Sequence, residues 1–171
     1  MPKKQNKIVF VIFSLLKSLV FAVIITLIVG YLLGCRYILV NGWSAQPDIR
    51  YQSIIITQKT KFEDLKVGDY ITFSMTGSSY ITHQIISIDI ENDQIICADN
   101  QYNSETGEYE HGGQQVLKYE NVVGKVVFSN YILGRTIFTI KENPWILVGL
   151  FVSAMLLLIV RDKCKTEPEF F

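Results

Sequence analysis

Two long apolar runs stand out along the chain, one near each end. The first covers residues 8–34, with few polar side chains, among them Ser14 and Lys17, and the second covers 145–160, with Ser153 as its one polar side chain. A helix needs roughly 20 mostly apolar residues to cross the hydrocarbon core of a bilayer. The pattern therefore predicts a membrane-spanning helix over 8–34, and a second over 142–160 with its first residues among the lipid headgroups.

The region between the runs, residues 35–141, shows the pattern of β-strands. Residues such as Ile, Val, Thr, Tyr and Phe dominate several segments, which turn signals separate at Gly68 and Asp69, at 76–79 and at 91–94. No part of this region has a helical period of useful length. We expect one β-rich domain, an antiparallel sheet or partly closed barrel, with strands over 53–59, 69–75, 80–90, 93–99 and 121–129.

Composition supports contact with lipid. Hydrophobic residues make up 49% of the chain, the mean hydropathy is +0.26 and the formal net charge is zero. A chain of this composition is too apolar to be an ordinary soluble domain. The short segments 1–7 and 161–171 carry Lys or Arg next to the apolar runs, the second at Arg161, Lys163 and Lys165, which favours the cytoplasmic side for both. We expect membrane lipid as a partner, no nucleic acid, and an extracytoplasmic domain over 35–141.

A cleavable signal peptide is the alternative for the first apolar run, because lysines precede it. The apolar part of a signal peptide is typically about 7–15 residues long and ends at a small-residue cleavage site. The run over 8–34 is far longer and ends in "YLLGCRY". We therefore expect the run to be retained as an anchor.

Cysteines and histidines predict no metal centre. Cys35, Cys97 and Cys164 cannot all pair with one another, and Cys97 lies in an apolar segment, where a thiol usually fills the core. His83 and His111 are the only histidines and follow no metal-binding spacing. We expect neither a metal nor an organic cofactor.

Ser44 is the candidate nucleophile, in the stretch "VNGWSAQPDI". A serine hydroxyl attacks a carbonyl usefully only when a base removes its proton, and a third group should orient that base. His83 is the candidate base, in a strand whose alternation puts it on one face with apolar residues, and Asp99 or Glu105 is the candidate acid. The residues alone leave open a structural interpretation, in which Ser44 is a turn serine, His83 a partly buried histidine and Asp99 a turn cap.

The order of the sequence motifs favours catalysis. After the first apolar run come "SAQP", "LKVGDYITF", "ITHQIISI", "ADNQYNSE" and "VVGKVVFSNYILG". In this order the chain resembles signal peptidase I of the archaeal and endoplasmic-reticulum branch, which also occurs in Gram-positive bacteria. It departs from that family's motifs at four positions, namely Ala45, Gln84, Ala98 and Glu105.

The resemblance implies a serine endopeptidase that removes signal peptides from secreted preproteins at the outer face of the membrane. Ser44 would be the nucleophile, with its backbone amide as an oxyanion donor, and His83 the general base. Asp99, or alternatively Glu105, would be the acidic partner. Many bacterial relatives carry a hydroxyl two positions before the nucleophile, where this chain has Gly42. Candidate substrate-binding residues are Gly42, Trp43, Ile49 and Tyr51, although the last three also suit packing in the core or in lipid.

Two other functions stay open. A member of this family that has lost catalysis could assist the assembly of surface proteins, with secretion or surface-assembly partners. A membrane-tethered β-domain could also bind partners by strand addition alone. Ser44, His83 and Asp99 are all present, which favours the peptidase.

Overall fold

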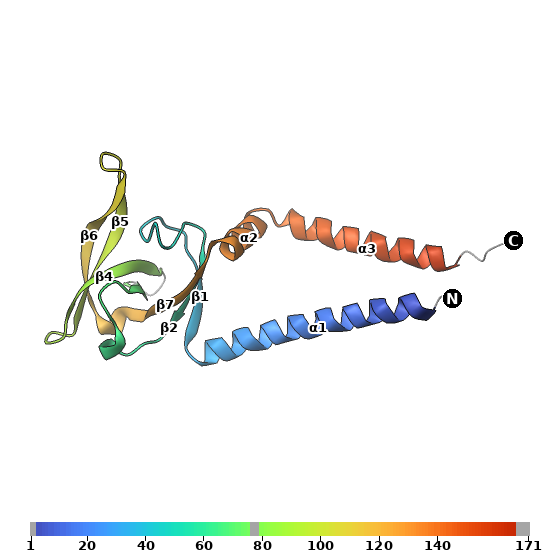
Figure 1. The fold of residues 1–171 in the computed structure, drawn as a ribbon, viewed down its shortest axis with the longest axis horizontal. Coiled ribbons are helices and arrows are strands. Elements are labelled where there is room, and N and C mark those ends of the chain that lie inside the picture. Colours follow the sequence, from blue (N-terminus) through green and yellow to red (C-terminus); the bar gives the residue numbers. More distant parts are fainter. Residues whose placement is uncertain (1–2, 76–78, 167–171) are drawn as a thin grey trace.

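A single antiparallel sheet lies at one end of the protein, and the long helices extend away from it (Figure 1). The computed structural model describes residues 3–75 and 79–166. The seven strands lie in the order β1-β2-β7-β3-β4-β5-β6, so β1 and β6 are the edges of an open sheet rather than neighbours in a closed barrel. The strands are β1 (Cys35–Leu39), β2 (Ile54–Gln58), β3 (Tyr70–Phe73), β4 (Ile81–Asp89), β5 (Gln94–Asn103), β6 (Glu108–Lys118) and β7 (Val122–Asn130).

Apolar side chains fill two separate core clusters. The larger cluster combines residues from β3, β4, β5 and β6, and the smaller one joins the loop after β1 to β2. The buried members of the larger cluster are Leu65, Ile71, Phe73, Ile85, Ile95, Cys97 and Leu117, and those of the smaller cluster are Val40, Ala45, Ile49 and Ile55.

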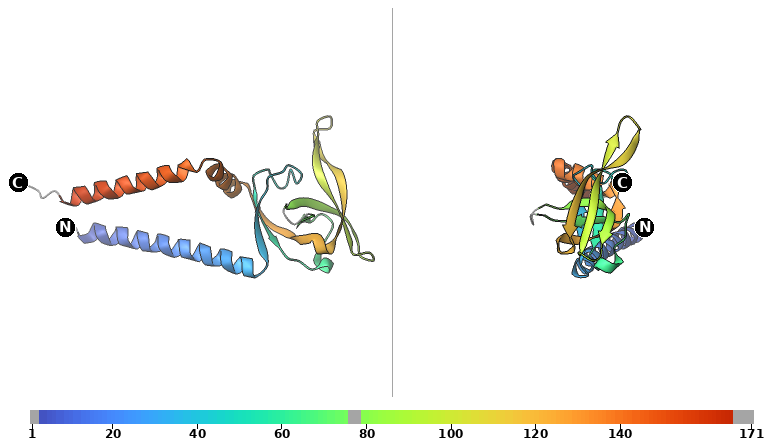
Figure 2. Two further views of the ribbon diagram at one scale, coloured as in Figure 1. Left: turned by 180° about the vertical axis from the view of Figure 1, so that it is seen from behind. Right: turned by 90° about the vertical axis from the view of Figure 1, so that its left-hand side faces the viewer.

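The long helices project from the same side of the sheet (Figures 1 and 2). Helix α1 (Lys3–Leu32) contains a stretch, Phe10–Leu32, with a mean hydropathy of 2.6 and none of its apolar window buried in the protein. Among the described residues, α1 is the one helix that is long and apolar enough to cross a membrane by itself. Helices α2 (Tyr131–Glu142) and α3 (Trp145–Thr166) are bent by 89° and pass that test only as a pair, so the second span stays a prediction.

Each predicted strand is present, and the mainly antiparallel β-structure of the domain is confirmed. The turn predicted at 91–94 joins β4 to β5, and Gly68, with a φ of 94°, forms the turn before β3. Residues 76–78 of the predicted connection 76–79 lie outside the described residues. Two short 3₁₀ helices, Phe62–Asp64 and Tyr119–Asn121, lie before β3 and β7.

The expectation of no helix between the two apolar runs was wrong, because α2 lies there. Its N-terminus is capped by Asn130, whose side chain accepts a hydrogen bond of 2.9 Å from the amide of Leu133. Gly134 and Phe138, four residues apart and therefore on one face, are buried, and α2 packs on β2. The small glycine conceals this face from a reading of apolar periodicity.

Candidate functional site

The loop between β1 and β2 carries Ser44. Its base is closed by two backbone hydrogen bonds, from Val40 to Ser53 at 2.8 Å and from Gln52 to Val40 at 2.9 Å. After the serine, Ala45 and Ile49 are buried in the smaller core cluster, and the Ile49 amide donates to the Ala45 carbonyl at 2.9 Å. The small side chain at position 45 therefore fits a filled core, and these anchors hold the turn that presents Ser44.

Strand β5 holds the loop from its other side. The backbone amide of Asn100 donates a hydrogen bond of 2.7 Å to the carbonyl oxygen of Ser44. Within the described residues, the backbone amide of Ser44 donates no hydrogen bond. This amide is therefore available to stabilise the oxyanion that would form on a substrate carbonyl oxygen if the Ser44 hydroxyl attacked its carbon.

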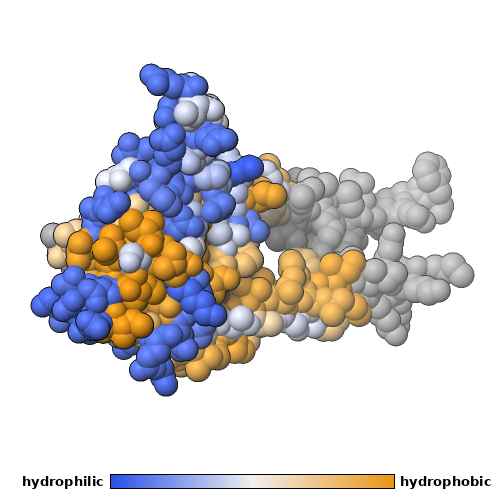
Figure 3. Space-filling view, turned by 60° about the vertical axis from the view of Figure 1, so that its left-hand side comes forward, coloured by the Kyte–Doolittle hydropathy of each residue, from blue (hydrophilic) through white to orange (hydrophobic). Residues whose placement is uncertain are grey.

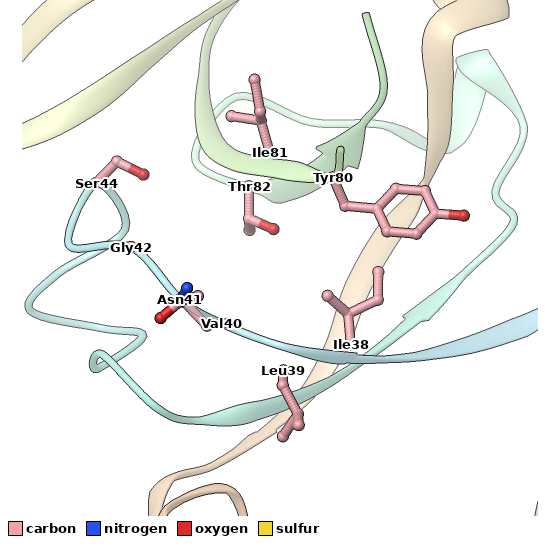
Figure 4. A pocket seen from close by; sticks show the side chains of 9 residues that line it. All are labelled: Ile38, Leu39, Val40, Asn41, Gly42, Ser44, Tyr80, Ile81 and Thr82. Carbon is pink, nitrogen blue, oxygen red and sulfur yellow. The ribbon is translucent and has the colours of Figure 1, made fainter. Parts of the chain in front are cut away.

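A cavity of about 330 Å³ opens beside Ser44, between the end of β1 and the start of β4 (Figure 4). The walls contributed by β1 and the start of β4 are largely apolar, and Gly42 and Ser44 form one end. Thr82 also faces the cavity, and its hydroxyl lies 3.0 Å from that of Thr72. Backbone of two separate strands therefore borders a cavity that reaches the candidate nucleophile.

His83 lies directly after Thr82 in β4, and 6% of its surface is exposed. Its ring meets that of Phe73 edge to face, with 5.6 Å between centroids. Of the two ring nitrogens, only Nδ1 is both buried and without a hydrogen-bond partner among the described residues. Burial lowers the pKa of His83 from its ordinary value of 6.5, and the charge of Asp99 opposes this shift. At neutral pH the imidazole is therefore uncharged and able to accept a proton.

Asp99 lies in β5, next to the residue that binds the Ser44 carbonyl. Its Oδ2 accepts a hydrogen bond of 3.0 Å from Gln101, whereas its Oδ1 is buried without a partner among the described residues. Glu105, the alternative acid, lies in the exposed turn between β5 and β6, where its amide donates to Asn103. Of these two carboxylates, Asp99 is the one that acts on the pKa of His83.

The fold brings Ser44, His83 and Asp99 to adjoining parts of the sheet without joining them all directly. Ser44 shares the cavity with the residue before His83, and shares a second pocket with Asp99. No hydrogen bond links the Ser44 hydroxyl to the His83 ring within the described residues. Proton transfer therefore requires a shift of the serine rotamer or of its loop. Catalytic hydrogen bonds of unliganded sites commonly tighten only on substrate binding.

The other candidate binding residues lie in three different surroundings. Trp43 is 65% exposed and stacks on Tyr51, with 4.5 Å between ring centroids. Tyr51 also meets Phe138 of α2, with 6.3 Å between ring centroids. The aromatic side chains therefore join the loop of residues 40–53, called the nucleophile loop below because it carries the candidate nucleophile, to the helix. Ile49 lies in the core. Gly42 borders the cavity, and a Cβ added there would meet only the Ser44 hydroxyl, at 3.9 Å.

A hydrogen-bonded chain around Tyr70 was missed at the sequence level. The Tyr70 hydroxyl donates to Asp48 of the nucleophile loop and accepts from the Asn100 side chain, each at 3.0 Å. The Asn100 side-chain oxygen also lies 3.1 Å from Nδ1 of His111. Burial and the nearby Asp48 carboxylate raise the pKa of Tyr70 to about 12, so the phenol stays protonated. The only available signal was that Tyr70 and Asn100 each lie inside a motif.

Two other motifs have a structural role. Asp69 of "VGDY" and Lys125 of "VVGKVV" form a salt bridge of 2.8 Å that ties the start of β3 to β7. A Cβ on Gly124 would overlap the backbone of Gln58, so β2 and β7 approach too closely there for a larger residue. These motifs shape the sheet on which the candidate site is built.

Within the described part of the chain, no group of three or more His, Cys, Asp or Glu side chains is placed to hold a metal ion. Cys97 is buried, and burial raises the pKa of its thiol to about 11, which keeps it protonated. Compared with described protein families and with curated proteins, the chain matches none.

Proposed function

We propose that the protein is a membrane-bound serine endopeptidase that removes signal peptides, as a member of the signal peptidase I family in its archaeal and endoplasmic-reticulum branch. The observation that carries the proposal is the position of Ser44. Its free backbone amide and its hydroxyl lie at the end of a cavity, on a loop bound to the strand that carries Asp99. A buried, uncharged histidine lies next along β4 from a residue of the same cavity.

In the proposed reaction, Ser44 Oγ attacks the carbonyl carbon of the scissile bond while His83 accepts its proton. The Ser44 amide stabilises the resulting oxyanion. His83 then gives the proton to the leaving amine, the C–N bond breaks, and an acyl-enzyme remains. Water, deprotonated by His83, attacks this ester and releases the signal peptide. The negative charge of Asp99 stabilises the imidazolium formed in each half of the reaction.

The substrate would lie in the cavity as an extended chain. Ile38, Leu39 and Ile81 give the cavity apolar walls suited to small apolar residues before the cleaved bond. The ends of β1 and β4 border it, so their backbone groups can pair with an extended peptide. For cleavage of a peptide bound in this position, the Ser44 side chain must turn toward His83. This movement would form the hydrogen bond between them that is absent without substrate.

Membrane attachment would raise the effective substrate concentration. Helix α1 is apolar along Phe10–Leu32, and a signal peptide in the same bilayer meets the site by diffusion in two dimensions. We propose that α3 forms a second span, that both termini are cytoplasmic, and that the sheet lies outside. Reporter domains fused to each terminus test this. At both termini, a reporter that works only in the cytoplasm should be active and one that works only outside should be inactive. A C-terminal fusion with activity outside would overturn the second span.

One observation favours a second candidate function. Ser44 and His83 make no hydrogen bond, as expected for a family member that has lost catalysis and assists the assembly of surface proteins. Such a protein would use the same cavity to bind extended segments of its partners without cleaving them.

The deciding experiment compares Ser44→Ala and His83→Ala with Ser87→Ala, an exposed serine on the same strand as His83. We expect the first two variants to abolish cleavage of a secreted preprotein by the purified full-length protein in lipid, while Ser87→Ala cleaves normally. Thermal unfolding and membrane insertion should be retained in all three. Normal cleavage by Ser44→Ala and His83→Ala would refute the peptidase. Full rescue of a surface-assembly defect by Ser44→Ala would favour the second function.

A further inference from the structure

A second pocket, of about 340 Å³, also adjoins Ser44. Ser44 lines both pockets, while their other lining residues differ. The nucleophile loop contributes Trp43 and Gln46 to the second pocket, and the hairpin of β5 and β6 contributes Asp99, Tyr102 and Tyr109. A peptide that fills the first cavity up to Ser44 would continue into the second.

Aromatic side chains form the walls of this second pocket. Tyr102 is 60% exposed, and its ring lies 5.3 Å from that of Tyr109, measured between centroids. The Tyr109 hydroxyl donates a hydrogen bond of 2.6 Å to Gln46, which joins the hairpin to the nucleophile loop. Trp43 is held on the opposite side by its stack on Tyr51. The pocket therefore presents large aromatic side chains that are held by their neighbours and remain partly exposed.

The hairpin that carries these tyrosines is acidic. Residues 99–111 include one Asp and three Glu but neither Lys nor Arg. Glu110 accepts hydrogen bonds only from the neutral side chains of Asn103 and Thr106, which leave its charge in place. In the described part of the chain the one salt bridge joins Lys125 to Asp69, away from the hairpin. Figure 3 shows the hydrophilic surface of the projecting end of this hairpin.

Exposed aromatic side chains with the Asp99 carboxylate in the pocket, and further carboxylates along the same hairpin, suit a cation. Lys and Arg are attracted to the faces of Trp and Tyr rings, and the carboxylates add a longer-range attraction. The first cavity differs, since none of its lining residues is charged. Of the two pockets that Ser44 lines, the second therefore favours a cationic side chain, because a carboxylate and aromatic rings line it and the first has neither a carboxylate nor a tryptophan.

We propose that the second pocket binds the part of the substrate that follows the cleaved bond, and that it selects preproteins with Lys or Arg among the first residues of the mature chain. The inference rests on the peptidase function proposed above. It assigns specificity to Trp43, Tyr102 and Tyr109 and to the charge of the hairpin. An acidic residue in this part of the substrate is disfavoured.

The experiment measures binding and cleavage separately. Fluorescent peptides carry Ala at the first and third positions before the cleaved bond, and Lys, Gln or Glu in turn at each of the first three positions after it. Binding is measured with full-length Ser44→Ala protein in lipid nanodiscs, which cannot form the acyl-enzyme. At one or more positions, we expect Lys to bind about fivefold more tightly than Gln, the size of an exposed cation–π contact, and Glu to bind most weakly. The preference should shrink as salt is raised.

Variants in the same background locate the preference. Tyr102→Leu removes an aromatic face and keeps an apolar side chain, and Glu110→Gln removes a charge. Each is expected to reduce the preference for Lys over Gln by at least about twofold. Glu91→Gln, the same change at the exposed turn between β4 and β5, is the matched control and should leave the preference intact.

The outcomes distinguish the two proposals. Wild-type protein that cleaves the Lys, Gln and Glu peptides equally, with equal binding to Ser44→Ala, would refute the second pocket and leave the peptidase standing. Wild-type protein that cleaves none of them, while Ser44→Ala still prefers Lys, would refute the peptidase and leave a cation-selective groove. Equal loss of preference in Glu91→Gln and Glu110→Gln would show that overall charge, rather than this pocket, selects the substrate.

Discussion

The backbone of Asn100 binds the backbone of Ser44, amide to carbonyl oxygen, at 2.7 Å. This contact joins residues from two separate motifs and sets the distance between the nucleophile loop and β5. The Asn100 side chain reinforces it through the Tyr70 hydroxyl, which in turn binds Asp48 at 3.0 Å. The loop that presents Ser44 is therefore fixed by a backbone contact to β5 and a side-chain contact to β3.

Tyr70→Phe tests whether this bracing matters for catalysis. The change removes both hydrogen bonds of the hydroxyl and frees Asp48, so the loop gains freedom around Ser44. We expect a fall in kcat of about tenfold, because small displacements of reacting groups are costly. The free energy of unfolding should fall by about 0.5–1.5 kcal/mol for each hydrogen bond lost.

Tyr119→Phe is the control for this prediction. It removes a hydroxyl that donates to the carbonyl of Thr60 at 2.7 Å, far along the sheet from the loop. A comparable loss of stability with unchanged kcat is expected. If both variants lower kcat equally, the effect of Tyr70 is one of general stability.

The pH dependence of cleavage should report the burial of His83. Only the neutral imidazole accepts the Ser44 proton, and burial lowers its pKa below the ordinary value of 6.5. We therefore expect kcat/KM to fall on the acid side with a midpoint below 6.5. Asp99→Asn removes the charge that raises this pKa, so the acid limb should move to lower pH while the maximal rate also drops. A shift to higher pH would contradict the assigned pairing.

The free energy of unfolding should also depend on the protonation of His83 and fall toward acid pH. Because the folded chain holds the His83 proton less tightly than the unfolded chain, the unfolded state binds more protons in the range between their pKa values. The His83 contribution to the free energy of unfolding therefore falls as pH drops below 6.5. Urea titrations at several pH values would give the free energy of unfolding of wild type and of His83→Gln. A plot of this free energy against pH should be less steep for the variant below pH 6.5.

The strands could be predicted from the sequence because most of them have an alternating or continuous apolar pattern. Two strands could not: β1 follows almost directly on the first apolar run, and β6, "EYEHGGQQVLK", is mostly exposed and polar. The extended backbone of β6 is maintained by pairing with β5 from Gln94 opposite Lys118 to Asn103 opposite Glu108. A strand held mainly by hydrogen bonds to its neighbour needs no alternating apolar pattern, so its sequence does not predict it.

The site was predictable only in part, for a related reason. The candidate nucleophile, base and acid each have a chemically distinctive side chain, so Ser44, His83 and Asp99 could be named. Their supports, Tyr70 and Asp48, act through contacts between residues far apart in the chain. Spacing along the sequence carries no information about such contacts without the register of the strands.

Gly134→Ala should separate α2 from the sheet. A Cβ at Gly134 would overlap the backbone of Gln52 and Ile54, so the helix must move or the strand must shift. We expect a loss of about 1–3 kcal/mol in the free energy of unfolding, as in other overpacked cores. Gly149→Ala in α3 is the control, because a Cβ there meets nothing within 4 Å. The control should stabilise the helix by up to about 1 kcal/mol, and thermal unfolding in detergent would measure both.

Gly42→Ser should raise the rate of cleavage. A Cβ at this position meets only the Ser44 hydroxyl, at 3.9 Å, so the added side chain fits and its hydroxyl can reach an oxyanion formed at Ser44. Removal of one oxyanion donor from a protease lowers kcat by about 100-fold or more, and we expect the added donor to raise kcat by about tenfold while KM changes little. Gly42→Ala, which fills the same space without a donor, should leave kcat near that of wild type. Equal rates for Gly42→Ser and Gly42→Ala would show that the oxyanion is already fully bound or lies elsewhere, and would remove Gly42 from the candidate site.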